Sequence, residues 1–143
     1  KDFDEGLAHA REENKPILLD FTGWTCVNCR RMEENVWSQP DIYRMLKEEY
    51  VLISLYVDES EALPASELFD FEFENGLIKP IQTIGQKWGT FQTLNFNSTS
   101  LPYYVLLSPD LEVLNPPVNM VDKELYQAWL QSGLEQHQFF AKR

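Results

Sequence analysis

A chain of 143 residues is long enough to bury a substantial core, and we predict a single domain over residues 1–143. A hydrophobic content of 43% and an aromatic content of 13% favour a packed globule over a disordered chain. The formal charge of −11 argues against a nucleic-acid partner, and no apolar run approaches the roughly 20 residues of a membrane span. The chain begins at Lys1 without an initiator Met or a signal peptide, so we expect an excised or processed piece.

The first predicted elements are a capped helix and a buried strand. Asp2 or Asp4 can cap the helix, and residues 14–16 end it. Three apolar residues share one helix face: Phe3, Leu7 and Ala10. Residues 17–22 then read as a strand that is apolar on both faces except for Asp20. Because burying a carboxylate is costly, we expect a raised pKa for Asp20. Its role is either a hydrogen bond within a turn or proton acceptance from a thiol.

The two cysteines of the chain, Cys26 and Cys29, follow this strand and open a predicted helix over residues 26–37. A strand that leads into a helix at a Cys-x-x-Cys places the first sulfur at the helix N-terminus. There the unpaired N–H groups and the helix dipole favour a thiolate, which is the reactive form of cysteine. The second sulfur is within reach to close a disulfide. We interpret the pair as a thiol–disulfide active site, with Cys26 as the nucleophile and Cys29 as the resolving thiol.

Three other interpretations of the cysteines remain open at this point. A structural disulfide would close a very short loop and contribute about 2 kcal/mol at most. A zinc site needs about four ligands, and the remaining candidates, His9 and His137, lie near opposite ends of the chain. The third is a pair of incidental thiols. A Cys-x-x-Cys beside a strand–helix pattern is typical of redox chemistry, so we predict no metal.

The charged residues of the predicted 26–37 helix have less specific patterns. Glu33 follows Cys29 by four residues and should lie one turn below it, as either a solvated charge or an auxiliary acid/base. Arg30 and Arg31 read as solvated helix charges. Ser38, with Pro40 in the first turn, should cap a further helix.

A second buried strand is predicted at residues 51–57, and an acidic insertion follows it at about 58–80. Residues 58–74 hold seven acids, and Phe69, Phe71 and Phe73 alternate with them before Asn75-Gly76. Asn-Gly between strand-forming residues is a strong hairpin signal. The inserted hairpin is either a lid that packs its Phe face on the body of the protein or a surface on which a partner docks.

The last third of the chain predicts alternating helices and strands. Residues 81–92 have helical spacing and should cover the sheet, residues 95–100 read as a loop, and residues 103–107 read as a strand. Residues 112–118 should include an edge strand closed by two prolines. Asp122 should cap a final helix. Four residues are expected on its core face: Leu125, Trp129, Leu130 and Leu134. Asn97-Ser98-Thr99 matches a glycosylation sequon, which is a frequent chance match.

The run from Ile17 to Phe21, followed by Trp24-Thr25-Cys26-Val27-Asn28-Cys29, resembles the active-site segment of thioredoxin-like proteins. It is similar in particular to the C-terminal periplasmic domain of the bacterial thiol:disulfide interchange protein DsbD. Other positions carry the match as well: Asp20, Glu33 and Leu101-Pro102. Two positions depart from the thioredoxin pattern, because Thr25 separates Trp24 from the first cysteine and Val27-Asn28 replaces Gly-Pro.

The resemblance implies an α/β thioredoxin-like fold, with a mixed sheet of four or five strands and helices on both faces. It implies a cis Pro102 that faces the disulfide, a role for Asp20 as proton acceptor and a role for Glu33 as auxiliary acid/base. The expected substrate contacts surround the disulfide: Trp24, Thr25, Val27, Asn28 and Leu101.

The resemblance also implies a function: a reductase, acting as a monomer, that passes electrons from a membrane-embedded thiol donor to protein disulfides. The implied location is the periplasm or cell envelope, either as a separate protein or as the soluble domain of a membrane protein, with cytochrome c biogenesis as one process served. No cofactor is expected, because the two sulfurs carry the electrons. The alternative is a thioredoxin-fold binding module for protein partners whose cysteines do no chemistry.

Overall fold

The computed structural model describes residues 2–141, and these fall into two compact units. The first unit holds the chain up to Leu55 and from Ser100 onward, and the second holds Tyr56–Thr99. The second unit therefore interrupts the first in sequence, at the place where the acidic insertion was predicted. That the two behave as a single domain stays a prediction.

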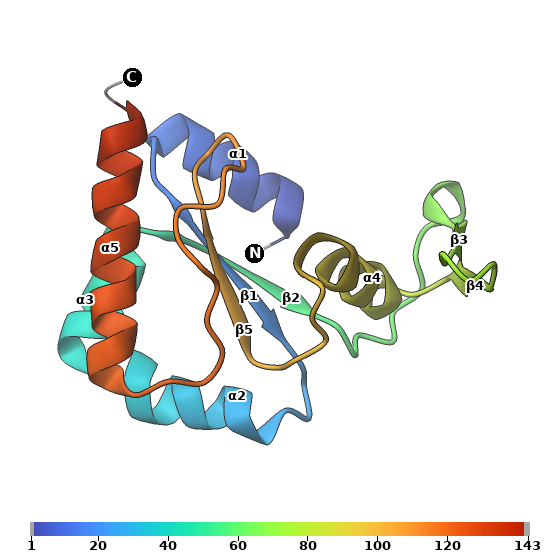
Figure 1. Cartoon of the computed structure of the whole chain (residues 1–143), viewed down its shortest axis with the longest axis horizontal. Coiled ribbons are helices and arrows are strands. Elements are labelled where there is room, and N and C mark those ends of the chain that lie inside the picture. Colours follow the sequence, from blue (N-terminus) through green and yellow to red (C-terminus); the bar gives the residue numbers. More distant parts are fainter. Residues whose placement is uncertain (1, 142–143) are drawn as a thin grey trace. The chain divides into compact units, whose positions relative to one another are not determined.

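A mixed sheet of three strands forms the centre of the first unit. Its strands are β1 (Ile17–Thr22), β2 (Val51–Tyr56) and β5 (Tyr103–Leu107), in the order β2-β1-β5. β1 and β5 are antiparallel, with Ile17 opposite Leu107 and Phe21 opposite Tyr103, whereas β1 and β2 run in the same direction (Figure 1). The α/β class and the mixed sheet are as predicted, but the sheet has three strands instead of four or five.

The predicted edge strand at residues 112–118 accounts for the difference in strand number. This segment meets β5 only at isolated bridges, between Leu107 and Val113 and between Tyr104 and Val118. The bridges are separated by Pro116-Pro117, and proline has no N–H group to donate to a ladder. The segment therefore follows the edge of β5 without forming a regular strand.

Helices cover both faces of this sheet. On one face lies α1 (Phe3–Glu13), where a Cβ added to Gly6 would come within 2.6 Å of the Ile53 side chain. The other face is covered by three consecutive helical segments and by the C-terminal helix. They are α2 (Val27–Met32), the π-helical turn η1 (Glu33–Trp37), α3 (Pro40–Glu48) and α5 (Lys123–Ala141). In Figure 1, α1 lies on one side of the strands and α3 and α5 lie on the other.

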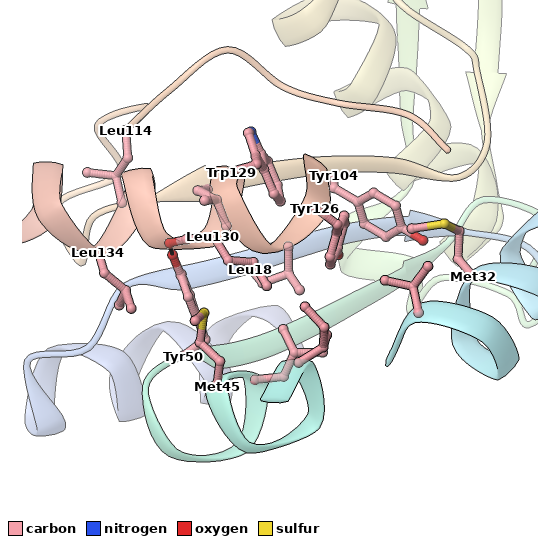
Figure 2. Close-up of a cluster of buried hydrophobic side chains, with 14 residues drawn as sticks. Leu18, Met32, Met45, Tyr50, Tyr104, Leu114, Tyr126, Trp129, Leu130 and Leu134 are labelled. Carbon is pink, nitrogen blue, oxygen red and sulfur yellow. Dashed lines mark hydrogen bonds between the residues drawn. The ribbon is translucent and has the colours of Figure 1, made fainter. Parts of the chain in front are cut away.

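The main hydrophobic cluster lies between the sheet and this second group of helices. Leu18 from β1, Tyr104 from β5 and Met32 from α2 belong to it, together with Tyr126 and Leu130 from α5. Figure 2 shows these side chains pointing toward one another, and the Tyr50 hydroxyl donates a hydrogen bond of 2.6 Å to the Leu130 carbonyl. The position of α2 is therefore fixed by packing on the sheet as well as by its connection to β1.

Two predicted helix caps are confirmed and one is wrong. The Asp2 carboxylate accepts a hydrogen bond from the Asp4 N–H, and the Asp122 carboxylate accepts one from the Leu125 N–H. Ser38 does not cap α3: the cap position belongs to Gln39, without a side-chain bond, and the Ser38 hydroxyl donates to the Glu34 carbonyl. Pro40 at the first helical position supplies the start signal, because its fixed φ suits a helix.

In the first and last helices, a residue adjacent to a predicted core residue is buried in its place. In α1 the fully buried residues are Gly6 and Ala10, while Phe3 and Leu7 are partly exposed. In α5, Trp129, Leu130 and Leu134 are buried as predicted, but Leu125 is 60% exposed. Its neighbour Tyr126 takes the core position and is completely buried. The Tyr126 hydroxyl accepts a hydrogen bond of 3.0 Å from the Trp37 indole, and this bond makes its burial possible.

The second unit contains the predicted hairpin, made of β3 (Phe69–Glu72) and β4 (Ile78–Ile81), after a short 3-10 turn at Ala65–Glu67. Gly76, with φ of 86°, lies in the loop between the strands, so the Asn-Gly prediction is confirmed. The following helix, α4, spans Ile84–Phe96 instead of 81–92. Ile81 ends β4, and α4 starts at Ile84 within a capping box formed by Thr83 at the N-cap and Gln86 in the first turn. The expected loop therefore begins only at Asn97.

None of the helices within residues 2–141 has the length and apolar character needed to cross a membrane.

Candidate active site

Cys26 occupies the N-cap position of α2, as the sequence predicted. Its backbone is extended, with φ of −79° and ψ of 105°, and its sulfur accepts a hydrogen bond of 3.2 Å from the Cys29 N–H. The two cysteines form a disulfide with a Cα–Cα distance of 5.3 Å. Cys26 is partly exposed, whereas Cys29 is only 2% exposed and belongs to the buried side of α2. Only the first sulfur can therefore meet a partner protein directly.

The residues around Cys26 form an exposed rim. Trp24 is 55% exposed and Val27 is 63% exposed, and the neighbouring Thr25 and Asn28 are also exposed. Leu101, the fifth predicted contact residue, is half-buried. Large apolar side chains at the surface are common at protein-recognition sites, so this rim is suited to contact a polypeptide substrate.

The Leu101–Pro102 peptide bond is cis, as the resemblance implied, and Pro102 is buried. It directly precedes β5, in which Tyr103 lies opposite Phe21 of β1. This register places the proline beside the end of β1, from which the chain enters the cysteine loop. The Asn119 amide donates to the Pro102 carbonyl at 3.3 Å and connects this turn to the segment before α5. That Pro102 faces the disulfide stays a prediction.

Asp20 is almost completely buried, at 3% exposed, and it lies in the middle of the sheet. Its carboxylate accepts one hydrogen bond of 2.9 Å, from the Ser54 hydroxyl on the adjacent strand β2. Desolvation by burial raises the pKa of Asp20 to about 7, against the lowering effect of the Ser54 hydrogen bond. The expected raised pKa is confirmed, and this carboxyl can take up or release a proton near neutral pH.

Asp20 lies on the sheet face that α2 covers. Side chains two residues apart on a strand share a face, so Asp20 shares one with Leu18, which packs in the same cluster as Met32 of α2. Cys29 is the other buried residue of α2, three positions before Met32. The buried carboxyl and the buried sulfur therefore come from two surfaces that pack on each other.

Glu33 forms an ion pair with Arg30 at 3.1 Å, with both side chains about one-third exposed. Its negative charge also contributes to the raised pKa of Asp20, and the positive charge of Arg30 opposes that effect. Glu33 is therefore electrostatically coupled to Asp20, although a direct role in proton transfer stays a prediction.

Arg30 is the residue that the sequence analysis missed. One of its terminal nitrogens donates to the Thr22 hydroxyl at 3.0 Å and to the Gly23 carbonyl at 3.2 Å, in addition to the ion pair with Glu33. These contacts connect α2 to the end of β1 and to the start of the cysteine loop. The only signal in the sequence is the three-residue spacing of Arg30 and Glu33, which is typical of helical ion pairs. Arg31 is exposed, as predicted.

No cluster of three or more potential metal-ligating side chains occurs in the part of the chain that the structure describes.

A disulfide at the N-terminus of a helix that follows a central strand, together with a cis-proline directly before the neighbouring strand β5, is typical of a thioredoxin-type redox site. The chain belongs to the thioredoxin-like family, whose model matches residues 1–80.

Two curated proteins are similar to part of the chain. Spermatogenesis-associated protein 20 of Homo sapiens is 42% identical over 57 residues, which cover 40% of this chain and 7% of that protein. Thiol:disulfide interchange protein DsbD 2 of Pseudomonas aeruginosa is 39% identical over 46 residues, which cover 32% of this chain and 8% of that protein. The chain thus spans less than a tenth of either relative.

Among solved structures, the reduced C-terminal domain of DsbD from Neisseria meningitidis has a similar fold. It superimposes with a TM-score of 0.59 at 13% identity, and the match covers 91% of each chain. The similarity to the DsbD C-terminal domain is thus structural over most of the chain and distant in sequence.

Proposed function

We propose that the protein is a thiol:disulfide oxidoreductase that works as a reductase of protein disulfides through the Cys26/Cys29 pair. The observation that carries this proposal is the asymmetry of the two sulfurs. Cys26 is partly exposed at the N-terminus of α2, whereas Cys29 is buried on the helix face that packs against the strand carrying Asp20.

The first step uses the reduced protein. The Cys26 thiolate, stabilised by the Cys29 N–H and the helix dipole, attacks one sulfur of a substrate disulfide. The substrate S–S bond breaks and a Cys26–substrate disulfide forms. The other substrate sulfur leaves as a thiolate and takes a proton from solvent. The exposed rim of Trp24 and Val27 holds the substrate polypeptide during this step.

The second step releases the substrate. The Cys29 thiol gives its proton to the carboxylate of Asp20, whose pKa of about 7 suits it to this transfer near neutral pH. The Cys29 thiolate attacks the Cys26 sulfur, the Cys26–substrate bond breaks, and the second substrate thiolate leaves. Two electrons have passed from the dithiol to the substrate disulfide, and the Cys26–Cys29 disulfide remains. A dithiol donor must then reduce it for the next cycle.

The source of those electrons, in this proposal, is a membrane-embedded thiol donor, and the substrates are proteins of the cell envelope, including those of cytochrome c biogenesis. The similarity to the interchange protein DsbD 2 and to a DsbD C-terminal domain supports this arrangement. The surroundings of Cys26 support the reducing direction, because Arg30, the nearest cation in sequence, is already paired with Glu33.

Insulin reduction by dithiothreitol tests the proposal. The protein should accelerate the reaction, Cys26→Ser should abolish the acceleration, and Cys29→Ser should trap a mixed disulfide through Cys26. A folded protein that gives no acceleration would instead support a thioredoxin-fold binding module that contacts protein partners without redox chemistry.

A further inference from the structure

The hairpin of the second unit exposes an unusual amount of apolar surface. Between residues 68 and 78 there are five large hydrophobic side chains that are at least 38% exposed: Leu68, Phe69, Phe73, Leu77 and Ile78. Single exposed apolar residues are ordinary, but a group of five on one short hairpin is typical of an interaction surface. The redox site of the first unit does not account for this surface.

The two edges of the hairpin differ in their capacity to accept another strand. Phe73 donates to the Leu77 carbonyl at 2.8 Å, and the ladder continues with Phe71 opposite Lys79 and Asp70 opposite Pro80. Because hydrogen-bonded pairs alternate along an antiparallel ladder, Phe71 and Lys79 bond to each other. The main-chain groups of Asp70 and Glu72 consequently point away from β4, along the outer edge of β3.

The outer edge of β4 is blocked. Pro80 has no N–H group, and the Gln82 carbonyl already accepts a hydrogen bond from Leu63 at 2.9 Å. The outer edge of β3 contains no proline, and no hydrogen bond occupies its Asp70 and Glu72 main-chain groups among the described residues. One edge of the hairpin is thus protected against pairing and the other is available.

Charge indicates what could pair there. The second unit carries seven acidic residues and two lysines, a formal charge of −5. Lys87 is paired with Glu67 at 3.3 Å, which leaves Asp70, Glu72 and Glu74 without an ion pair among the described residues. These acids alternate along the strand with Phe69, Phe71 and Phe73, so one face of β3 is anionic and the other is aromatic.

We propose that the outer edge of β3 is a docking site for an extended segment of a partner protein in which basic residues alternate with apolar ones. The segment adds as a third strand, with main-chain hydrogen bonds to Asp70 and Glu72. Its basic side chains lie beside the acids of β3 and its apolar side chains lie beside the phenylalanines. Phe71 and Phe73 also line a cleft of about 740 Å³ with Gly89 and Thr93 of α4, which gives the apolar side chains room.

A second copy of this chain is a poor occupant of the same edge. Pairing two β3 edges would bring Asp70 and Glu72 against identical acids, and each chain has a formal charge of −11. Like charges opposite each other destabilise a sheet. The site therefore selects a cationic segment over self-association.

The test uses the full oxidised chain and a short blocked peptide in which Lys alternates with Val. The expected result is saturable binding that weakens as salt is raised, with the amide signals of Asp70 and Glu72 shifting in a ¹H–¹⁵N spectrum. A peptide that groups the same residues into a Lys block and a Val block should bind more weakly, because its side chains cannot match both faces of β3. A peptide in which Glu alternates with Val should not bind. Equal binding of all three peptides, or shifts confined to other residues, would overturn the proposal.

A matched pair of variants separates the main-chain bond from the charge. Asp70→Thr and Asp70→Pro both remove the carboxylate, but only the proline removes the outward N–H, and it leaves the ladder to β4 intact. Asp70→Pro should bind the alternating peptide about threefold to tenfold more weakly than Asp70→Thr. Equal affinities would contradict strand addition. Slow hydrogen exchange at Phe71 and Phe73 in both variants checks that the hairpin is retained, and a dimer in sedimentation would assign the edge to a second copy instead.

Discussion

Asp20 links the stability of the protein to pH, because its carboxyl must be buried in either protonation state. Its pKa is about 7 in the fold and near 4 in an unfolded chain. The native state therefore binds the proton more tightly, and the unfolding free energy falls as pH rises from about 4 to 7. The total loss is at most about 4 kcal/mol.

Asp20→Asn should remove this dependence, because an amide does not ionise. The variant should fold and should exceed the wild type in stability above about pH 7, with the difference shrinking toward pH 4. Urea denaturation at several pH values measures the difference. The same variant should release mixed disulfides slowly, because Cys29 loses its proton acceptor. A stable variant with unchanged turnover across about pH 6–8 would show that Asp20 is only structural.

Arg30 should matter more than its neighbour Arg31, since it contacts Thr22, Gly23 and Glu33. Arg30→Gln should lower stability by about 1–2 kcal/mol through the lost hydrogen bonds. It should also raise the pKa of Asp20 further, because the positive charge that lowers this pKa is removed. The pH profile of turnover should therefore move to higher pH. Arg31→Gln is the control and should change neither property. Glu33→Gln should shift the profile in the opposite direction and by at least as much, because the charge of Glu33 affects the pKa of Asp20 more than that of Arg30 does.

The two sulfurs should differ in reactivity once the disulfide is reduced. Cys26 is the partly exposed N-cap of α2, whereas Cys29 is 2% exposed. Iodoacetamide near neutral pH should therefore label Cys26 first, and peptide mass spectrometry after a short exposure can identify the labelled residue. Labelling of Cys29 first would reverse the assignment of nucleophile and resolving thiol.

At the scale of secondary structure, the sequence was most informative where a local rule acts alone. Asp2 and Asp122 cap their helices, and Asn75-Gly76 turns a hairpin, because each signal depends only on its nearest neighbours. Where packing decides, the sequence was less informative. Leu125 and Tyr126 are both apolar candidates for the inner face of α5. Tyr126 is the buried one, and it packs against the Tyr104 ring and accepts a hydrogen bond from Trp37 across the core.

The candidate site shows the same contrast between features set by local sequence and features set by packing. The Cys-x-x-Cys at a helix start and the buried Asp20 were predictable from residue type and order. The contacts of Arg30 were not, because its partners Thr22 and Gly23 lie in a different element and their positions depend on how α2 packs on the sheet. The predicted edge strand at residues 112–118 was wrong for a related reason. Its pairing depends on β5, a different element, and two isolated bridges replace a regular ladder there.

Gly133 shows how tightly α5 packs on the sheet. A Cβ added there would meet the Leu106 side chain and would come within 2.8 Å of the Tyr50 hydroxyl, which is itself bonded to Leu130. Gly133→Ala should therefore destabilise the protein by about 1–3 kcal/mol, although alanine is the better helix former by about 1 kcal/mol. Ser132→Ala, on the exposed side of the same helix, is the control and should be neutral or slightly stabilising. Equal denaturation midpoints for the two variants would contradict this packing.

For the whole molecule, charge and helix placement together predict the direction of electron flow. A thiol–disulfide pair becomes oxidising when its thiolate is strongly stabilised, because the reduced form is then favoured. The helix dipole and the Cys29 N–H stabilise the Cys26 thiolate here, as they do wherever a cysteine caps a helix.

Further stabilisation of that thiolate is absent from the neighbouring sequence. Val27 and Asn28 carry no charge, and the guanidinium of Arg30 is paired with Glu33. The acids at positions 20 and 33 and the formal charge of −11 oppose an additional anion. The potential should therefore lie nearer the thioredoxin value of about −270 mV than the strongly oxidising value of about −120 mV. Equilibration with glutathione, followed by quantification of the oxidised fraction, measures it. A value above roughly −170 mV would indicate an oxidase and would contradict the proposed direction of transfer.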